Sequence, residues 1–130
     1  MRFIKKFWNM KKRTNYKTGH FAEKITALLL ICKGYRPIAC NFVTGRGTGA
    51  GEIDLIMKHG KTLVFVEVKK RKDYITAAEA ITQKNQLRTS RASEAFLRRY
   101  PQYSNCQIRY DAVLFFPKHW PVHIKDAWRL

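Results

Sequence analysis

Two alternating segments joined by one short turn constrain this chain more than any other feature of its sequence. Residues 51–58 and 61–69 each follow the two-residue period of a strand, and only His59 and Gly60 lie between them. A two-residue connection that contains glycine is typical of a tight turn between antiparallel strands. The sequence therefore predicts a β-hairpin over residues 51–69.

A turn at His59-Gly60 sets a register in which Asp54 lies opposite Phe65 and diagonal to Glu67, about 7–8 Å away between backbones. One face of the hairpin then carries four charged and three apolar residues: Glu52, Asp54, Ile56, Leu63, Phe65, Glu67 and Lys69. The opposite face is apolar: Ile53, Leu55, Met57, Val64, Val66 and Val68. Because the apolar face must be buried, a slip by one residue would bury the charges in its place.

The carboxylates of Asp54 and Glu67 would repel each other unless a cation lies between them. Mg²⁺ (or Mn²⁺) prefers such oxygen ligands and keeps several of its waters. Lys69 shares their face and is placed to stabilise an attacking water and the charge that develops on a phosphate. We therefore predict Asp54, Glu67 and Lys69 as catalytic residues. Alternating acids and lysines are equally typical of a solvated strand face, and the pattern alone leaves both interpretations open.

A helix is predicted over residues 19–33, because Gly34 and Pro37 follow it. On a helical wheel, Glu23 falls on one stripe with Ala27 and Leu30. A carboxylate on an inward, apolar stripe needs a partner, so Glu23 is a candidate third ligand of the metal. The alternative is an acid in the first turn that stabilises the helix dipole.

The charge of the chain restricts its partners. There are 26 Lys and Arg residues against 9 Asp and Glu, a net charge of +17. Such a field attracts polyanions, so the candidate partners are nucleic acid and an anionic membrane, and a ribosome-associated or otherwise structural basic protein is the alternative. Residues 1–18 hold seven basic residues and no acid. We interpret them as a flexible basic arm preceding a domain over residues 19–130, although an organellar targeting peptide has a similar composition.

The remaining pattern predicts a mixed sheet. Strands are expected over residues 38–44, 107–116 and 122–124, a helix over residues 77–100, and a flexible glycine-rich loop over residues 45–51. This order predicts one α/β or α+β domain with helices flanking the sheet. Three cysteines without metal-binding spacing and no secretory segment indicate a reducing setting, the cytoplasm.

Basic residues also form one stripe of the helix predicted over residues 77–100. Lys84, Arg88 and Arg91 lie on this stripe, and Lys70 and Arg71 continue the basic surface from the end of the hairpin. We predict that these five residues contact phosphates. A solvated helix face is the alternative.

The hairpin motif resembles a known family. Residues 51–56 (GEIDLI) and 64–69 (VFVEVK), followed by Arg71, resemble the signature of the YraN family. These bacterial proteins are predicted endonucleases, similar to archaeal Holliday junction resolvases of the PD-(D/E)XK nuclease superfamily. The resemblance spans about residues 19–127, and its weaker part includes Ala22-Glu23, Glu79-Ala80 and the segment 109–111.

The resemblance implies a restriction-endonuclease-like fold, Asp54 and Glu67 as metal ligands, Lys69 as the catalytic lysine and Glu23 as the acid of the first helix. It implies a Mg²⁺-dependent endonuclease acting on DNA, including branched or damaged DNA, and a homodimer. No small-molecule cofactor or membrane partner is expected. The chain departs from the pattern in its long glycine-rich loop and in Leu87, where some superfamily members carry a tyrosine. A non-catalytic nucleic-acid-binding module on the same fold is the alternative function.

Overall fold

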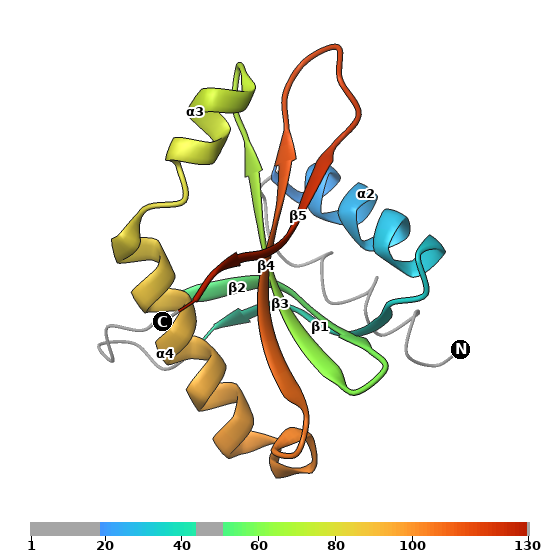
Figure 1. The fold of residues 1–130 in the computed structure, drawn as a ribbon, viewed down its shortest axis with the longest axis vertical. Helices are drawn as coiled ribbons and strands as arrows, with labels where there is room; N and C mark the ends of the chain where they lie inside the picture. The colour runs from blue at the N-terminus through green and yellow to red at the C-terminus, as the bar shows by residue number, and fades with distance from the viewer. Residues whose placement is uncertain (1–18, 44–50, 130) are drawn as a thin grey trace.

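The computed structural model describes residues 19–43 and 51–129, which form one mixed sheet flanked by helices (Figure 1). The strands lie in the order β1-β2-β3-β4-β5; β3 and β4 are parallel, and the other neighbouring pairs are antiparallel. The elements are α2 (Gly19–Cys32), β1 (Arg36–Val43), β2 (Glu52–His59), β3 (Thr62–Lys70), α3 (Tyr74–Glu79), α4 (Gln83–Arg99), a 3₁₀ turn (Pro101–Tyr103), β4 (Gln107–Phe115) and β5 (Val122–Trp128). The predicted single α+β domain with a central mixed sheet is confirmed. The predicted arm over residues 1–18, residue 44 of the strand predicted over residues 38–44, and residues 45–50 of the predicted loop lie outside the described residues.

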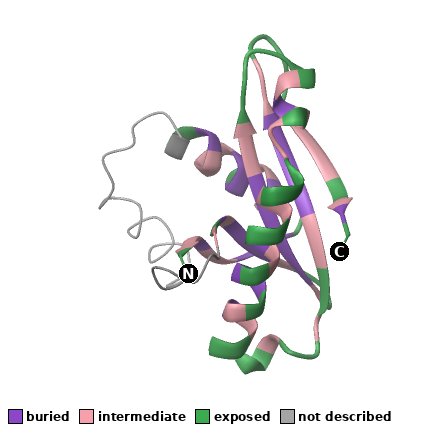
Figure 2. Cartoon of the chain, turned by 90° about the vertical axis from the view of Figure 1, so that its left-hand side faces the viewer, coloured by how far each residue is buried: buried purple, intermediate pink, exposed green. Residues whose placement is uncertain are grey.

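Helices cover both faces of the sheet, and the buried residues lie between them (Figures 1 and 2). On one face, Ala27 and Leu30 of α2 pack with Leu55 and Val66. Three of these four residues are completely buried and Leu30 is 1% exposed. The inward stripe predicted for the first helix is therefore confirmed.

The second face is covered by α3 and α4. Ala92 and Phe96 of α4 pack on Ile56, Leu63 and Phe65, and these three strand residues are completely buried. The apolar part of the predicted charged face is thus core, because β2 and β3 are covered from both sides.

The hairpin turns one residue later than predicted. His59 pairs with Thr62, so Gly60 and Lys61 form the turn. Gly60 has φ of 60°, and a type II′ hairpin turn places glycine at its first central position for this reason. Phe65 consequently lies opposite Ile56 and not opposite Asp54. The shift amounts to two residue numbers, so it leaves each side chain of β3 on its predicted face.

The single helix predicted over residues 77–100 is two helices, α3 and α4. The side chain of Thr82 caps α4 by accepting a hydrogen bond from the N–H of Asn85 (3.2 Å), and Asp73 caps α3 by accepting one from Thr76 (2.7 Å). An N-cap residue has extended backbone, and this conformation at Thr82 separates the two helices. No helix in the described part of the chain is long and apolar enough to cross a membrane.

The first helix ends as predicted. Gly34 has φ of 92°, and the N–H groups of Gly34 and Tyr35 donate to the carbonyls of Ile31 (3.0 Å) and Leu30 (2.9 Å). This is the Schellman pattern, which favours glycine because it requires a left-handed residue.

Candidate active site

Asp54 lies where β2 and β3 separate. The paired residues of this hairpin end with Leu55 opposite Val66. One residue further, the side chain of Asp54 accepts a hydrogen bond from the backbone N–H of Val68 through Oδ2 (2.8 Å). In a regular ladder, a backbone carbonyl of β2 would accept the N–H of Val68. Here the carboxylate of Asp54 accepts it instead.

The alternation of β2 changes at the same point. Leu55 packs on the α2 face, whereas Ile53 packs with Ile56 and Phe65 on the α4 face. The predicted placement of Ile53 beside Leu55 is wrong, because the two-residue period holds only while the strand stays regular. This change brings Asp54 between the two strands.

Glu67 and Lys69 form an ion pair beside this position. Lys69 Nζ lies 2.9 Å from Glu67 Oε1, and the two side chains are 18% and 11% exposed, respectively. Their limited exposure argues against the solvated strand face that the sequence left open. Asp54 and Glu67 lie directly beyond the last pair of the hairpin, Leu55 and Val66, on their respective strands, and their carboxylates are near enough to interact.

The electrostatics of Asp54 show which charged groups surround it. Burial raises its pKa well above the ordinary value, and the neighbouring carboxylate of Glu67 raises it further. The hydrogen bond from Val68 opposes these effects, Glu23 adds a smaller upward contribution, and Lys69 lowers the pKa. The fold thus brings the four predicted residues Glu23, Asp54, Glu67 and Lys69 into one electrostatic neighbourhood.

The donor set suits a hard divalent cation. Carboxylate oxygens are the ligands that Mg²⁺ prefers, and a cation would relieve the repulsion that raises the pKa of Asp54. Within the described ranges, however, no three His, Cys, Asp or Glu side chains form a ready metal-binding group. Glu23 is therefore close enough to influence Asp54, but it does not complete a three-ligand set with Asp54 and Glu67.

The predicted phosphate-binding residues are all exposed: Lys70, Arg71, Lys84, Arg88 and Arg91. The N–H of Arg71 donates to the carbonyl of Phe115 (3.0 Å), which joins the residue after β3 to β4. The carbonyl of Arg88 accepts a hydrogen bond from the N–H of Gly51 (3.2 Å). A Cβ atom on Gly51 would lie 3.0 Å from the Cβ of Arg88, so a larger residue here would require α4 and the start of β2 to move slightly apart. Arg88 of α4 therefore lies against Gly51, which precedes Asp54 by three residues on the chain.

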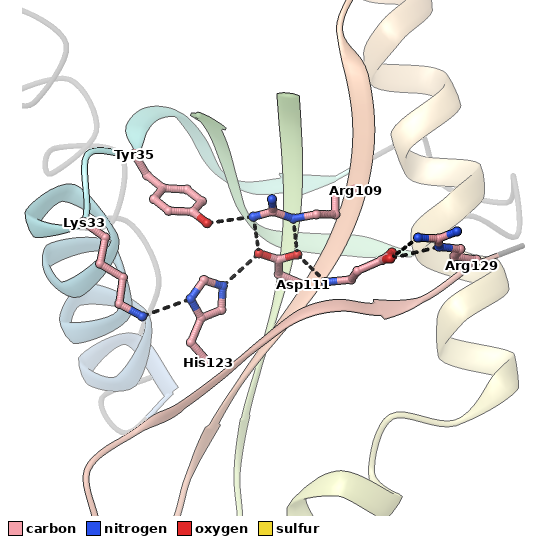
Figure 3. A network of polar contacts seen from close by, with 7 residues as sticks. Lys33, Tyr35, Arg109, Asp111, His123 and Arg129 are labelled. Atoms are coloured by element: carbon pink, nitrogen blue, oxygen red, sulfur yellow. Dashed lines mark hydrogen bonds and ion pairs between the residues drawn. The ribbon is translucent and has the colours of Figure 1, made fainter. Parts of the chain in front are cut away.

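A polar network lies on the α2 face of β4 and β5 (Figure 3). Asp111 is completely buried; it accepts hydrogen bonds from Arg109 (2.8 and 2.9 Å) and the N–H of Asp126 (2.9 Å), and its Oδ2 lies 2.8 Å from His123 Nε2. Burial opposes ionisation, yet the hydrogen bonds from His123, Arg109 and Asp126 hold the pKa of Asp111 at about 2. The ion pair between Arg109 and Asp111, which alternate on one strand face, supports the sheet. No sequence signal indicated the contribution of His123.

Two further residues near the site were not predicted to have a role in it. Asn41 of β1 contacts the carboxylates of Glu23 and Glu52 through its side-chain amide. The sequence placed Glu52 on the charged face but gave it no function, and it offered no signal for Asn41.

The fold and the site together define a class of protein: an α+β domain whose mixed sheet carries two acids and a lysine at the point where two strands separate. The chain belongs to the Uncharacterised protein family UPF0102, whose model matches residues 22–115. The family indicated by the hairpin motif is thereby confirmed.

Relatives in this family match most of the chain. UPF0102 protein amb4503 of Paramagnetospirillum magneticum is 45% identical over 112 residues, which cover 86% of this chain and 87% of that protein. A UPF0102 protein of Parvibaculum lavamentivorans is 44% identical over 114 residues, covering 88% and 83%. Among solved structures, Archaeoglobus fulgidus Hjc, a Holliday junction resolvase, is similar with a TM-score of 0.46 and 18% identity, covering 79% of this chain and 72% of that one.

Proposed function

We propose that this protein is a metal-dependent nuclease that hydrolyses phosphodiester bonds in DNA. The observation that supports this most is the position of Asp54, held between two separating strands by the N–H of Val68 and beside the Glu67–Lys69 pair. Asp54 and Glu67 would hold Mg²⁺ or Mn²⁺, which when bound supplies Lewis-acid stabilisation of the phosphate and activation of water. Glu23 is a third candidate for this role, and its contribution through an intervening water suits a cation that keeps several waters.

The side chains themselves orient and stabilise the reacting groups. Lys69 is the cation beside the two acids, so its ammonium would stabilise the attacking water and the negative charge that develops on the phosphate. Glu67 holds Lys69 in place through their 2.9 Å ion pair. The low exposure of both side chains strengthens these interactions relative to those in bulk water.

The exposed basic residues would bind the rest of the substrate. Lys70 and Arg71 directly follow Lys69 on β3 and the segment after it, where they would contact phosphates next to the reacting one. Arg88 and Arg91 of α4 would contact phosphates further along the strand, because Arg88 adjoins the start of β2. These contacts fix the position of DNA and carry no sequence information.

A cleavage assay tests the proposal. Labelled linear, nicked, flapped and four-way DNA would be incubated with the protein and Mg²⁺ or Mn²⁺. We predict that Asp54→Ala abolishes cleavage and that Lys69→Ala lowers its rate by about 10²–10³-fold, the usual effect of removing a partner that stabilises the transition state. Binding of DNA by Lys69→Ala should weaken only slightly, since many other cations remain.

Lys61→Ala is the matched control, because Lys61 is an exposed lysine at the hairpin turn, and it should cut at the wild-type rate. A folded, metal-loaded wild type that cuts none of the substrates yet binds them would indicate the non-catalytic nucleic-acid-binding module. Cleavage by Lys69→Ala at the wild-type rate would refute the role of the lysine.

Two associated expectations complete the proposal. We expect the protein to act in the cytoplasm, where its three cysteines, none of which forms a disulfide, would stay reduced. We also expect a two-fold homodimer if the substrate is a symmetric junction, which light scattering would detect.

A further inference from the structure

Asn41 lies next to the candidate active site on β1. Its neighbours Cys40 and Phe42 pair with Leu55 and Ile53 of β2, so the register places Asn41 opposite Asp54. The backbone of Asn41 has φ of 50°, a left-handed conformation that asparagine adopts more readily than most other residues with a side chain. The strand is therefore locally distorted at the residue opposite Asp54.

The side chain of Asn41 links two acids from different elements. With its nitrogen toward the carboxylates, its amide donates to Glu23 Oε2 of α2 and to Glu52 Oε1 of β2, each over 3.1 Å. A primary amide has two N–H donors and both would be used here. The opposite amide orientation would set its carbonyl oxygen against two carboxylate oxygens.

An uncharged donor suits this position electrostatically. Glu23 contributes to the raised pKa of Asp54, so the acid from α2 is held towards a carboxylate that repels it. A lysine would satisfy Glu23 by neutralising it and would compete with any cation bound nearby. The amide of Asn41 stabilises the carboxylate and leaves its negative charge in place.

We propose that Asn41 is a positioning residue, which holds the carboxylate of Glu23 towards the Asp54–Glu67 pair so that Glu23 acts on the same cation through an intervening water. This rests on the proposed metal-dependent function. It assigns to β1, which carries no predicted site residue, the task of fixing α2 relative to the hairpin, because Asn41 also binds Glu52 of β2. Outer groups that orient acidic side chains typically change metal affinity by about 10–100-fold when they are removed.

The test is the affinity of the full chain for Mn²⁺, measured by titration calorimetry without DNA. Asn41→Gly removes the amide, and glycine tolerates the left-handed backbone, so the variant should unfold cooperatively as the wild type does. We expect its Mn²⁺ affinity to fall by about 10–100-fold. Asn105→Gly, in the exposed turn before β4, is the matched control and should bind as tightly as the wild type.

A double-variant comparison separates positioning from a general effect on the fold. If Asn41 acts mainly through Glu23, Asn41→Gly introduced into a Glu23→Ala background should lower Mn²⁺ affinity by much less than it does in the wild type, since residues in one network are not additive. Equal losses in both backgrounds, or wild-type affinity in Asn41→Gly, would overturn the proposal.

A second readout needs no metal. In the ¹H–¹⁵N spectrum of the metal-free protein, the side-chain amide signals of Asn41 should shift in Glu23→Gln and stay in place in Glu94→Gln, an exposed acid of α4. If the wild type binds no Mn²⁺, the proposed metal-dependent function fails, and these signals alone decide whether Asn41 holds Glu23. Amide signals that do not respond to Glu23→Gln would refute the contact.

Discussion

Ionising the carboxylate of Asp54 in the fold costs stability. Burial and the neighbouring Glu67 raise its pKa, so the folded protein binds a proton at this residue more tightly than the unfolded chain does. The contribution of Asp54 to stability is therefore lost as the pH rises from its ordinary value towards the raised one. A residue that is unfavourable for folding and retained at the junction of two strands is typical of a functional site.

At the residue scale, we predict that Asp54→Asn stabilises the metal-free protein at neutral pH by about 0.5–2 kcal/mol. Asparagine keeps an oxygen that accepts the N–H of Val68 and removes the buried charge. Urea unfolding, measured below the ordinary pKa of 3.8 and again above neutral pH, should show the gain only at the higher pH. An equal gain at both values would mean that charge is not its cause.

We predict that Mg²⁺ stabilises the wild type more than it stabilises Asp54→Asn. Excess Mg²⁺ should raise the thermal midpoint of the wild type, since a ligand that binds only the folded state stabilises it. Asp54→Asn should gain little from Mg²⁺. A similar rise in both proteins would place the bound ion elsewhere.

At the scale of elements, Asp111 joins β5 to the rest of the sheet. Tyr110 pairs with Trp128 and Ala112 with Ile124, so three residues of β5 lie opposite Asp111 in a bulge. Asp126 within this bulge has φ of 53°, and its N–H is bound by the Asp111 carboxylate over 2.9 Å. A single buried side chain therefore replaces the backbone pairing that the bulge interrupts.

We predict that Asp111→Asn destabilises the protein by about 3–5 kcal/mol at neutral pH, because it removes a completely buried carboxylate that binds both the half-buried Arg109 and His123. The pKa of Asp111 is about 2, below its ordinary value of 3.8, so its contribution is complete above 3.8 and is lost as the pH falls towards 2. Chemical denaturation across this range should show the wild type and variant converging at low pH. Asp126→Asn, which breaks a surface pair with Arg129, should have little effect, and an equal loss there would refute the argument from burial.

At the scale of the whole molecule, charge governs how the protein meets nucleic acid. The net charge of +17 produces attraction that extends beyond any single contact and weakens as salt screens it. Residues 1–18 contribute seven of the 26 basic residues and none of the acids. The truncated chain would still carry the exposed cations of β3 and α4.

We predict DNA binding that weakens steeply with salt, by about 10³–10⁵-fold between 50 and 200 mM if six to ten phosphates are contacted. Deleting residues 1–18 should lower both the affinity and the slope with salt while the domain still unfolds cooperatively. A full-length variant with the seven basic residues of this segment changed to glutamine is the control and should match the deletion. A slope that is the same in the wild type and both variants would show that the segment makes no phosphate contacts.

The sequence by itself determined the location of the acidic site and the end of the first helix. Asp54, Glu67 and Lys69 lie in two segments that pair through one short turn, so their proximity depends on local chain geometry. The end of the first helix at Gly34 likewise depends on one residue, because glycine readily adopts the left-handed conformation that this end requires. The motif of the hairpin was specific enough to indicate the family.

Only the tertiary structure decided how the site is arranged. A prediction from local periodicity assumes that a strand stays paired and that its side chains keep alternating between the two faces. It therefore missed two features: the backbone pairing of β2 and β3 ends before Asp54, and Ile53 packs on the α4 face. Whether β2 stays regular depends on helices packed against its two faces, and these helices precede and follow the hairpin in the sequence. The contact of Asn41 with Glu23 likewise joins β1 to α2 through side chains. Such contacts connect residues whose proximity arises only when the layers assemble, so no pattern within one segment contains them.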